Sequence, residues 1–266
     1  MLEINNLSVI YHKDDQTFKA VDGVSLKVND GETLGLAGES GSGKSTVALS
    51  ILKLVSSAGE ITSGEILWNG EDILKLSDKR LRALRGNEIA MIFQDPFSSL
   101  NPAFTIGDQI AEAVALHQSV KGRGTMVKVN ELLELVHLSE GIVHKYPHEL
   151  SGGMRQRAMI AMALAGLACR QAGKPKLLIA DEPTTALDVT IQAEILKLLK
   201  GIQAKLGMSI VLITHNLALV YGFCDRVCIM HNGLLIEEGL VRDIFAAPKA
   251  QHTRDLIESI PKAKWR

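Results

Sequence analysis

The sequence predicts an α/β fold with a mainly parallel β-sheet, an antiparallel β subdomain at the N-terminus and an inserted α-helical subdomain. Alternating apolar residues within 2–9 and 18–28 indicate half-exposed strands. Helical spacing of apolar residues within 106–116 and 126–138 indicates the helical insertion. Continuous apolar runs are typical of strands buried on both faces of a parallel sheet. They span 33–37, 89–93, 177–180 and 209–213.

Composition limits the possible classes of protein. The 266 residues are 46% hydrophobic, which is ample for a buried core. Lysine and arginine number 29 against 30 aspartates and glutamates, so no basic excess favours a nucleic-acid-binding protein. The three cysteines form no repeated C-x-x-C, which disfavours a disulfide framework and fits a reducing cytoplasm.

No segment of the sequence predicts membrane insertion or secretion. The first residues lack the charged-then-apolar pattern of a signal peptide. The longest apolar run, 158–169, is well short of the roughly 20 residues that cross a bilayer. We therefore expect any membrane role to depend on a partner protein.

The segment 38–45 reads Gly-Glu-Ser-Gly-Ser-Gly-Lys-Ser and fits the phosphate-loop pattern G-x-x-x-x-G-K-[ST] in full. It follows the apolar run 33–37 and precedes the helix-compatible stretch 46–54, which is the strand, loop and helix context that the pattern requires. Its glycines allow backbone N–H groups to point inward at a polyphosphate. The predicted nucleoside triphosphate contacts are Gly38, Ser40, Gly41, Ser42, Gly43, Lys44, Ser45 and Thr46.

Within this loop two side chains have specific predicted roles. Lys44 is expected to reach the β- and γ-phosphates, and the Ser45 hydroxyl is expected to bind Mg²⁺.

Tyr11, placed in a polar loop, either stacks on an adenine base or is an ordinary surface tyrosine. The sequence around it leaves both interpretations open.

Polar residues follow three of the predicted buried strands. Gln94 ends the strand 89–93, where it either holds Mg²⁺ and the attacking water or simply terminates the strand. Asp181 and Glu182 follow 177–180; we expect Asp181 to hold Mg²⁺ and Glu182 to orient or deprotonate a water. His215 follows 209–213, where a lone histidine is commonly structural. Its placement, equivalent to that of Gln94 and Glu182, makes it a candidate for a hydrogen bond to the γ-phosphate.

A second predicted anion site begins at Leu150-Ser151-Gly152-Gly153, at the start of a long apolar helix from Met154 to Ala168. In isolation this segment also fits an ordinary serine N-cap. A single nucleotide bound to a monomer needs only one helix N-terminus of this kind. We therefore expect the second site to contact a nucleotide that is bound to another copy of the protein. Asp188 is the expected N-cap of a helix over 189–206.

The C-terminal part predicts a hairpin of 226–230 and 234–237, two short helices at 241–245 and 253–257, and a tail at 261–266. Cys224, Cys228 and His231 lie near one another in the sequence. We do not expect a metal site there, since a buried strand presents thiols naturally and no second ligand pair follows.

Taken together, these motifs resemble the nucleotide-binding subunit of an ATP-binding-cassette (ABC) transporter over essentially the whole chain. In that family a tyrosine like Tyr11 stacks on adenine, a glutamine like Gln94 forms the Q-loop and the segment 150–154 is the signature. The aspartate that matches Asp188 forms the D-loop, and the histidine that matches His215 senses the γ-phosphate. The resemblance implies a single ABC ATPase domain with a phosphate-loop NTPase core.

Longer strings resemble the dipeptide, oligopeptide and nickel importer subfamily; they are 93–102, 146–157 and 184–192. Two departures affect what is expected. The connection 168–175 looks longer than in the family, which suggests a bulged surface loop. The chain also ends at Arg266 without the cysteine-bearing extension of many relatives, so no iron–sulfur cluster is expected and the nickel or metal-chelate branch is modestly favoured.

The resemblance implies a mechanism and a set of partners. Two cassettes, paralogues or copies, would meet head to tail, so that each ATP with its Mg²⁺ lies between residues 38–45 of one and Ser151, Gly152, Gly153 and Asp188 of the other. Glu182, His215 and Gln94 would act in hydrolysis, and Ser45, Gln94 and Asp181 would hold Mg²⁺. Two transmembrane permease subunits and, indirectly, an extracytoplasmic solute-binding protein would be partners at the cytoplasmic face of the plasma membrane.

The implied core comprises 1–93 and 170–240, the helical subdomain 94–169 and a short C-terminal tail 241–266. The main alternative is a non-transport ABC ATPase that acts on ribosomes or nucleic acid. Such proteins usually carry two cassettes or a coiled-coil insertion, and neither is found in this sequence. A phosphate-loop kinase or GTPase is a weaker alternative, because it has no use for the second serine-glycine helix start.

Overall fold

The computed structural model describes residues 1–13, 16–118, 122–168, 176–185 and 187–260. The predicted loop at 168–175, with Cys169, and the tail at 261–266 lie outside these residues, apart from Ala168. Two compact units make up the chain. The first unit comprises Met1–Leu81 with Ser209–Arg266, and the second comprises Arg82–Met208.

The first unit begins with an antiparallel sheet in the strand order β2-β1-β4-β5. Its strands are β1 (Leu2–Lys13), β2 (Gln16–Val28), β4 (Gly59–Trp68) and β5 (Glu71–Asp72). Val24, Leu26 and Val28 alternate with exposed neighbours, so one face of β2 faces the core. Asn69 and Gly70 join β4 to β5 with positive φ angles of 52° and 85°. The predicted antiparallel subdomain is confirmed.

The first unit also contains part of a parallel sheet, in the strand order β10-β9-β3-β8. β3 pairs in parallel with β8 and β9, and β10 is antiparallel to β9. Every residue of β3 and β8 is buried, as the continuous apolar runs predict. The strands are β3 (Thr33–Ala37), β8 (Ser209–Thr214), β9 (Arg226–His231) and β10 (Leu234–Leu240).

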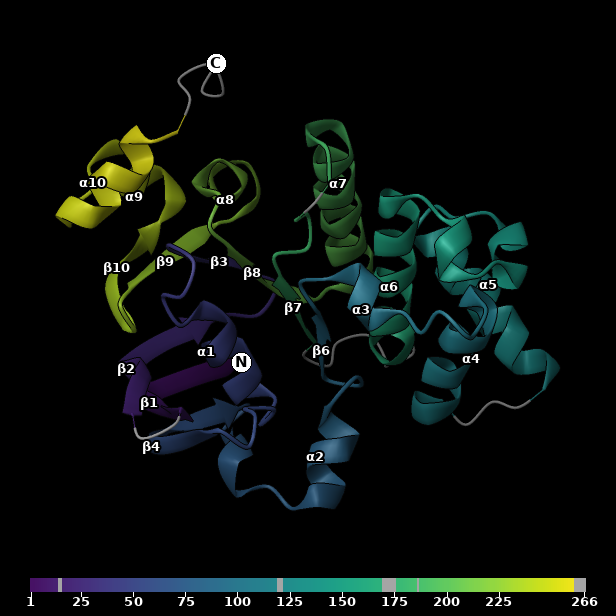
Figure 1. The fold of residues 1–266 in the computed structure, drawn as a ribbon, viewed down its shortest axis with the longest axis horizontal. Coiled ribbons are helices and arrows are strands. Elements are labelled where there is room, and N and C mark those ends of the chain that lie inside the picture. The colour runs from purple at the N-terminus through teal and green to yellow at the C-terminus, as the bar shows by residue number, and fades with distance from the viewer. Residues whose placement is uncertain (14–15, 119–121, 169–175, 186, 261–266) are drawn as a thin grey trace. The chain divides into compact units, whose positions relative to one another are not determined.

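Short helices complete the first unit. They are α1 (Lys44–Ile51), the 3₁₀ turn η1 (Ile73–Lys75), α8 (Leu217–Phe223), α9 (Val241–Ala246) and α10 (Gln251–Glu258). α9 packs against β9 and β10, and Figure 1 shows α9 and α10 beside this hairpin. The predicted C-terminal hairpin and both short helices are therefore present. α2 (Asp78–Leu84) spans the division between the units.

The second unit combines two parallel strands with the helical insertion. β6 (Ile89–Ile92) pairs with β7 (Leu177–Asp181). Within the insertion α4 packs against both α5 and α6, as Figure 1 shows. The helices are α3 (Pro96–Ser99), α4 (Ile106–His117), α5 (Arg123–Leu135), η2 (Glu140–His144), η3 (Pro147–Glu149), α6 (Gly152–Leu167) and α7 (Val189–Leu206).

None of the helices in the described parts of the chain combines the length and the hydropathy that a membrane-crossing helix requires.

Candidate functional site

The phosphate loop lies between β3 and α1 in the first unit, and its glycines are required by its geometry. Gly38, Gly41 and Gly43 have φ angles of 148°, 80° and 100°. A Cβ atom at Gly38 would lie 2.1 Å from the Met230 carbonyl oxygen, and one at Gly43 would lie 2.3 Å from the Ala20 carbonyl oxygen. Both positions therefore exclude any side chain, which explains why the loop pattern needs glycine there.

Lys44 is the first residue of α1, and its ammonium group lies inside the curl of the loop. The residue is 5% exposed. Its Nζ donates hydrogen bonds to the carbonyl oxygens of Gly38 (2.9 Å) and Glu39 (2.5 Å) and to Ser42 Oγ (3.3 Å). The loop thus places one cation next to a helix N-terminus, where the helix dipole and N–H groups favour a bound anion.

Two other predicted nucleotide contacts belong to the first unit. Tyr11 lies in β1, paired with Phe18 of β2 and Gly59 of β4, so the prediction of a polar loop at this residue is wrong. Its ring is half-buried and packs close to Gly59. His215 directly follows β8 and is exposed, where the apolar run predicts the end of a strand.

The second unit brings Gln94 and Glu182 into direct contact. Gln94 Nε2 donates a hydrogen bond of 2.9 Å to Glu182 Oε2, although 88 residues separate the two in sequence. Parallel pairing of β6 and β7 accounts for this, because it places the carboxyl ends of both strands at one edge. The Thr185 hydroxyl donates a second bond, of 2.8 Å, to the same oxygen.

The two acidic residues after β7 have different surroundings. Asp181 is the last residue of the strand and 5% exposed. Glu182 is half-buried and has a left-handed φ of 46°, which is uncommon for a residue with a Cβ. Such backbone strain persists where the surroundings over-determine it, and it clusters at functional sites. Here the bonds from Gln94 and Thr185 fix the orientation of the Glu182 carboxylate.

The signature segment forms the N-terminus of α6. Ser151 is the N-cap, and its side chain accepts a hydrogen bond of 3.4 Å from the Met154 backbone N–H. A Cβ atom at Gly152 would lie 3.2 Å from Leu187 Cδ2, and one at Gly153 would lie 2.9 Å from Ile191 Cγ2. The two glycines therefore allow the start of α6 to approach the start of α7 closely. The helix begins two residues earlier than the sequence predicts.

Asp188 is the N-cap of α7, as predicted. Its Oδ1 accepts hydrogen bonds of 3.0 Å from the backbone N–H groups of Thr190 and Ile191. Gln192, in the first turn of α7, donates bonds of 3.1 Å to the carbonyl oxygens of Thr184 and Leu187. Gln192 therefore holds the ends of the turn that follows Glu182.

The sequence interpretation missed the contacts of Thr185 and Gln192. Thr185 lies three residues after Glu182, a spacing that allows a turn to close, and this was the available signal. The amide of Gln192 carries no comparable local signal, because its partners are backbone carbonyl oxygens. Cys224 and Cys228 are both buried, and burial raises the pKa of the Cys228 thiol.

Comparisons with known proteins identify the family. The ABC transporter family matches residues 21–185. The chain is 47% identical over 264 residues to the probable peptide ABC transporter ATP-binding protein y4tR of Sinorhizobium fredii, covering 98% of this chain and 77% of that protein. It is 48% identical over 264 residues to the dipeptide transport ATP-binding protein DppD of Haemophilus influenzae, covering 98% of this chain and 78% of that protein.

Solved structures agree with this assignment. A dimeric structure of the ATP-binding cassette MJ0796, in a post-hydrolysis state bound to ADP and Pi, superposes with a TM-score of 0.78 at 28% identity, covering 91% of this chain and 99% of that one. The cbiO1 protein of Clostridium perfringens superposes with a TM-score of 0.76 at 28% identity, covering 99% and 96%. The chain belongs to the ABC transporter family, and it is an ATP-binding ATPase cassette of that family.

Proposed function

We propose that this chain is the ATP-hydrolysing motor of an importer for peptides, with nickel or metal chelates as the alternative solutes. The relatives named for peptide and dipeptide transport match 98% of the chain at 47% and 48% identity. A motor subunit does not contact the solute, so the solute class comes from these relatives and not from the site.

The proposed ATP contacts are those that the sequence predicts. Gly38 and residues 40–46 surround the phosphates, Lys44 neutralises them and Tyr11 stacks on the base. Tyr11 is only half-buried in β1, which is compatible with this assignment. The donors proposed for Mg²⁺ are a hydroxyl, an amide oxygen and a carboxylate, from Ser45, Gln94 and Asp181. Mg²⁺ is a hard cation that prefers oxygen ligands, so this donor set fits the ion.

Glu182 is the proposed general base for the attacking water, with Gln94 and His215 completing the surroundings of the γ-phosphate. The single observation that carries this proposal is the carboxylate held by two side chains, at 2.9 Å from the Gln94 amide nitrogen and 2.8 Å from the Thr185 hydroxyl. A fixed carboxylate can accept a proton from a water without reorganising. Bound Mg²⁺ would supply charge neutralisation at the phosphates.

We further propose a head-to-tail dimer, in which Ser151, Gly152, Gly153 and Asp188 of one cassette face the nucleotide of the other. The exposed serine and the N-terminal dipole end of α6, a helix of 16 residues, support an anion site at this end. Within each chain, the nucleotide-binding core would comprise residues 1–93 and 170–240, and the helical subdomain would comprise residues 94–169. ATP would then hold two cassettes together, and hydrolysis would release them.

The first test is Glu182→Gln. The variant should bind MgATP with nearly wild-type affinity and accumulate as a dimer with ATP. Its turnover should fall at least about 100-fold, because a general base accelerates a reaction by about that factor or more. Binding, phosphate release and size-exclusion chromatography measure these three properties. Glu112→Gln, at an exposed position of α4, is the matched control and should behave as wild type. Wild-type turnover in Glu182→Gln would remove this residue as the base.

The transport role is tested separately, by purification of the tagged chain from native membranes in mild detergent. We expect two multi-spanning permease proteins, a sister ATPase or a second copy of this chain, and a solute-binding protein whose ligand identifies the solute. Ribosomes or nucleic acid without membrane proteins would instead support a non-transport ABC ATPase. The ATP chemistry proposed for Glu182 does not depend on that outcome.

A further inference from the structure

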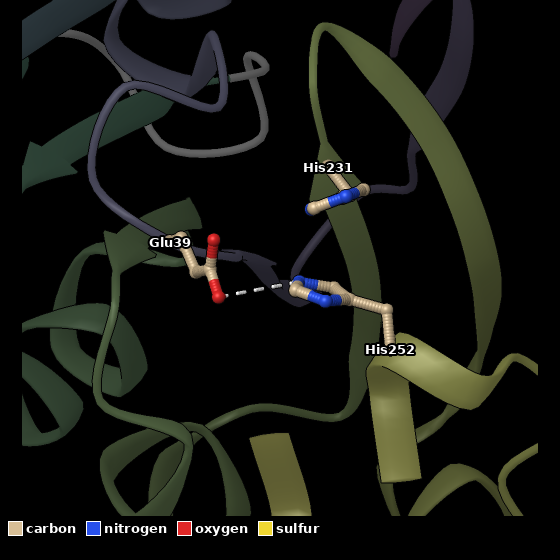
Figure 2. A group of neighbouring side chains, drawn as sticks. All are labelled: Glu39, His231 and His252. Carbon is tan, nitrogen blue, oxygen red and sulfur yellow. Dashed lines mark ion pairs between the residues drawn. The ribbon is translucent and has the colours of Figure 1, made fainter. Parts of the chain in front are cut away.

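A cluster of three side chains in the first unit takes no part in the proposed hydrolysis. Glu39 comes from the phosphate loop, His231 is the last residue of β9 and His252 lies in α10. One ligand atom of each residue lies within 4.8 Å of the others. Figure 2 shows the three side chains converging from their separate segments. The cluster therefore joins parts of the chain that are far apart in sequence.

The two imidazoles form the centre of this cluster. Their ring centroids are 3.8 Å apart with 37° between the planes. His252 Nε2 lies 4.0 Å from Glu39 Oε1, beyond hydrogen-bond distance. This nitrogen is buried and has no hydrogen-bond partner among the described residues. A buried polar atom without a partner is costly, and its presence calls for an explanation such as an ion that it binds.

The surroundings suit a metal cation. Each of the two imidazoles can offer one ring nitrogen to a metal. The Glu39 carboxylate supplies a negative charge, and its side chain is 59% exposed, so it can move and water can complete the coordination. Asn232 Nδ2 lies 3.1 Å from His231 Nε2. Because an amide nitrogen donates, a metal ion would either replace this contact on Nε2 or bind Nδ1 after the amide turns its oxygen towards Nε2–H.

The donor set selects the kind of ion. Two nitrogens and one carboxylate oxygen suit zinc-class first-row ions, namely Zn²⁺, Cu²⁺, Ni²⁺ and Co²⁺, rather than Mg²⁺ or Ca²⁺. Zinc binds histidine nitrogen at about 2.0–2.1 Å, which requires the three ligand atoms to approach one another more closely than they do here. Rotation of the exposed Glu39 side chain and small rotations of the rings provide this approach.

We propose that Glu39, His231 and His252 form a binding site for a zinc-class divalent ion. The ion links α10 and the end of β9 to the phosphate loop, at a residue whose carbonyl oxygen also accepts a hydrogen bond from Lys44 Nζ. This site is separate from the Mg²⁺ that accompanies ATP, because its donors are mainly imidazoles and none of its three residues belongs to the proposed Mg²⁺ ligands.

The test uses the full chain stripped with a chelator, in buffer without nucleotide or Mg²⁺. Co²⁺ is titrated and followed by its visible d–d absorption, and Zn²⁺ then displaces it. We expect one equivalent of Co²⁺, and a higher melting temperature with Zn²⁺ because the ion binds the folded state. His231→Gln, His252→Gln and Glu39→Gln should each weaken binding by about tenfold or more, since each removes a ligand.

His144→Gln is the matched control, because His144 is exposed in η2 of the second unit and should leave metal binding unchanged. Cu²⁺ bound to the wild-type chain should show electron paramagnetic resonance coupling to two nitrogens, a measurement that needs no variant to fold. Unchanged affinity in His231→Gln and His252→Gln, a thiolate charge-transfer band from cysteine ligation, or no binding at micromolar Zn²⁺ would each overturn the proposal.

Discussion

Gly166 and Gly201 allow a direct test of close packing in the second unit. Both glycines lie within helices, Gly166 in α6 and Gly201 in α7. By helix propensity alone, Gly→Ala should stabilise each helix by about 1 kcal/mol. The space around them differs. A Cβ atom at Gly166 would lie 2.2 Å from the Gly86 carbonyl oxygen, whereas none of the described residues has an atom within 4 Å of a Cβ at Gly201.

The expected magnitude follows from what can move around Gly166. The clashing atom is backbone, and the same Cβ would lie 3.1 Å from His117 Cγ. Gly86 cannot easily move away, because it is itself closely packed: a Cβ atom added at Gly86 would lie 2.3 Å from His117 Nε2. Forcing extra volume into a packed site costs about 1–3 kcal/mol, and a backbone clash lies at the upper end. After the gain in helix propensity, we expect Gly166→Ala to destabilise the protein by about 2 kcal/mol.

Urea unfolding of wild type, Gly166→Ala and Gly201→Ala, followed by far-ultraviolet circular dichroism, measures these differences. Gly201→Ala should be as stable as wild type or gain up to about 1 kcal/mol. In thermal unfolding, Gly166→Ala should lose about 4–8 °C, at about 2–4 °C for each kcal/mol in a protein of this size. Equal stabilisation by both substitutions would refute the packing argument and leave helix propensity as the deciding effect.

Two further predictions concern the first unit. Gly43→Ala should abolish detectable ATP binding without unfolding the protein. The new Cβ atom would lie 2.3 Å from the Ala20 carbonyl oxygen and would displace the phosphate loop. Equilibrium dialysis with ATP measures the loss of binding. Burial alone would raise the pKa of Glu237, but hydrogen bonds from the Lys249 and Ala250 backbone N–H groups, at 2.8 Å and 3.1 Å, outweigh it and lower that pKa. The carboxylate of Glu237 therefore contributes stability above its ordinary pKa of 4.5, and this contribution disappears as pH falls through the lower folded value. Glu237→Gln should cost about 1–3 kcal/mol at pH 7 and progressively less in acid, as urea unfolding at several pH values would measure; a cost that is constant with pH would contradict this reasoning.

Local signals in the sequence predicted the elements that local chemistry determines. Asp188 caps α7 and Ser151 caps α6, each with its own side chain. Each of these features depends on residues within a few positions of one another. The buried strands can also be predicted from the local sequence, because a continuous apolar run without alternation indicates a strand that is buried on both faces of the sheet.

Tyr11 shows where local reading fails. The residues around it are polar, and polarity without alternation favours a loop. In the structure β1 lies between β2 and β4, so its backbone N–H and C=O groups are paired on both sides. Ladder hydrogen bonds with both neighbours keep this end of β1 extended whatever its side chains prefer. A single sequence does not contain the register of those partners.

Pairs that meet across the fold could not be predicted for the same reason. The sequence placed His231 beside Cys228, its near neighbour in β9, but successive side chains on a strand point to opposite faces. Residues three apart, such as these two, therefore face away from each other. The partners that His231 does meet are Glu39 and His252, which only the packing of three separate segments brings together.

The position of Glu39 explains how one loop can accommodate both proposed sites. A phosphate loop binds its anion through backbone N–H groups and its lysine, so the side chains at its variable positions are not used for that purpose. The Glu39 side chain is exposed and lies near His252 of α10, while its carbonyl oxygen faces Lys44. A metal ion would bind the Glu39 carboxylate, and a phosphate would bind Lys44, whose ammonium group contacts the carbonyl oxygen of Glu39. Because linkage is reciprocal, any effect of Zn²⁺ on ATP affinity must equal the effect of ATP on Zn²⁺ affinity, and measuring both in wild type and His252→Gln separates coupling through Glu39 from ions that bind elsewhere.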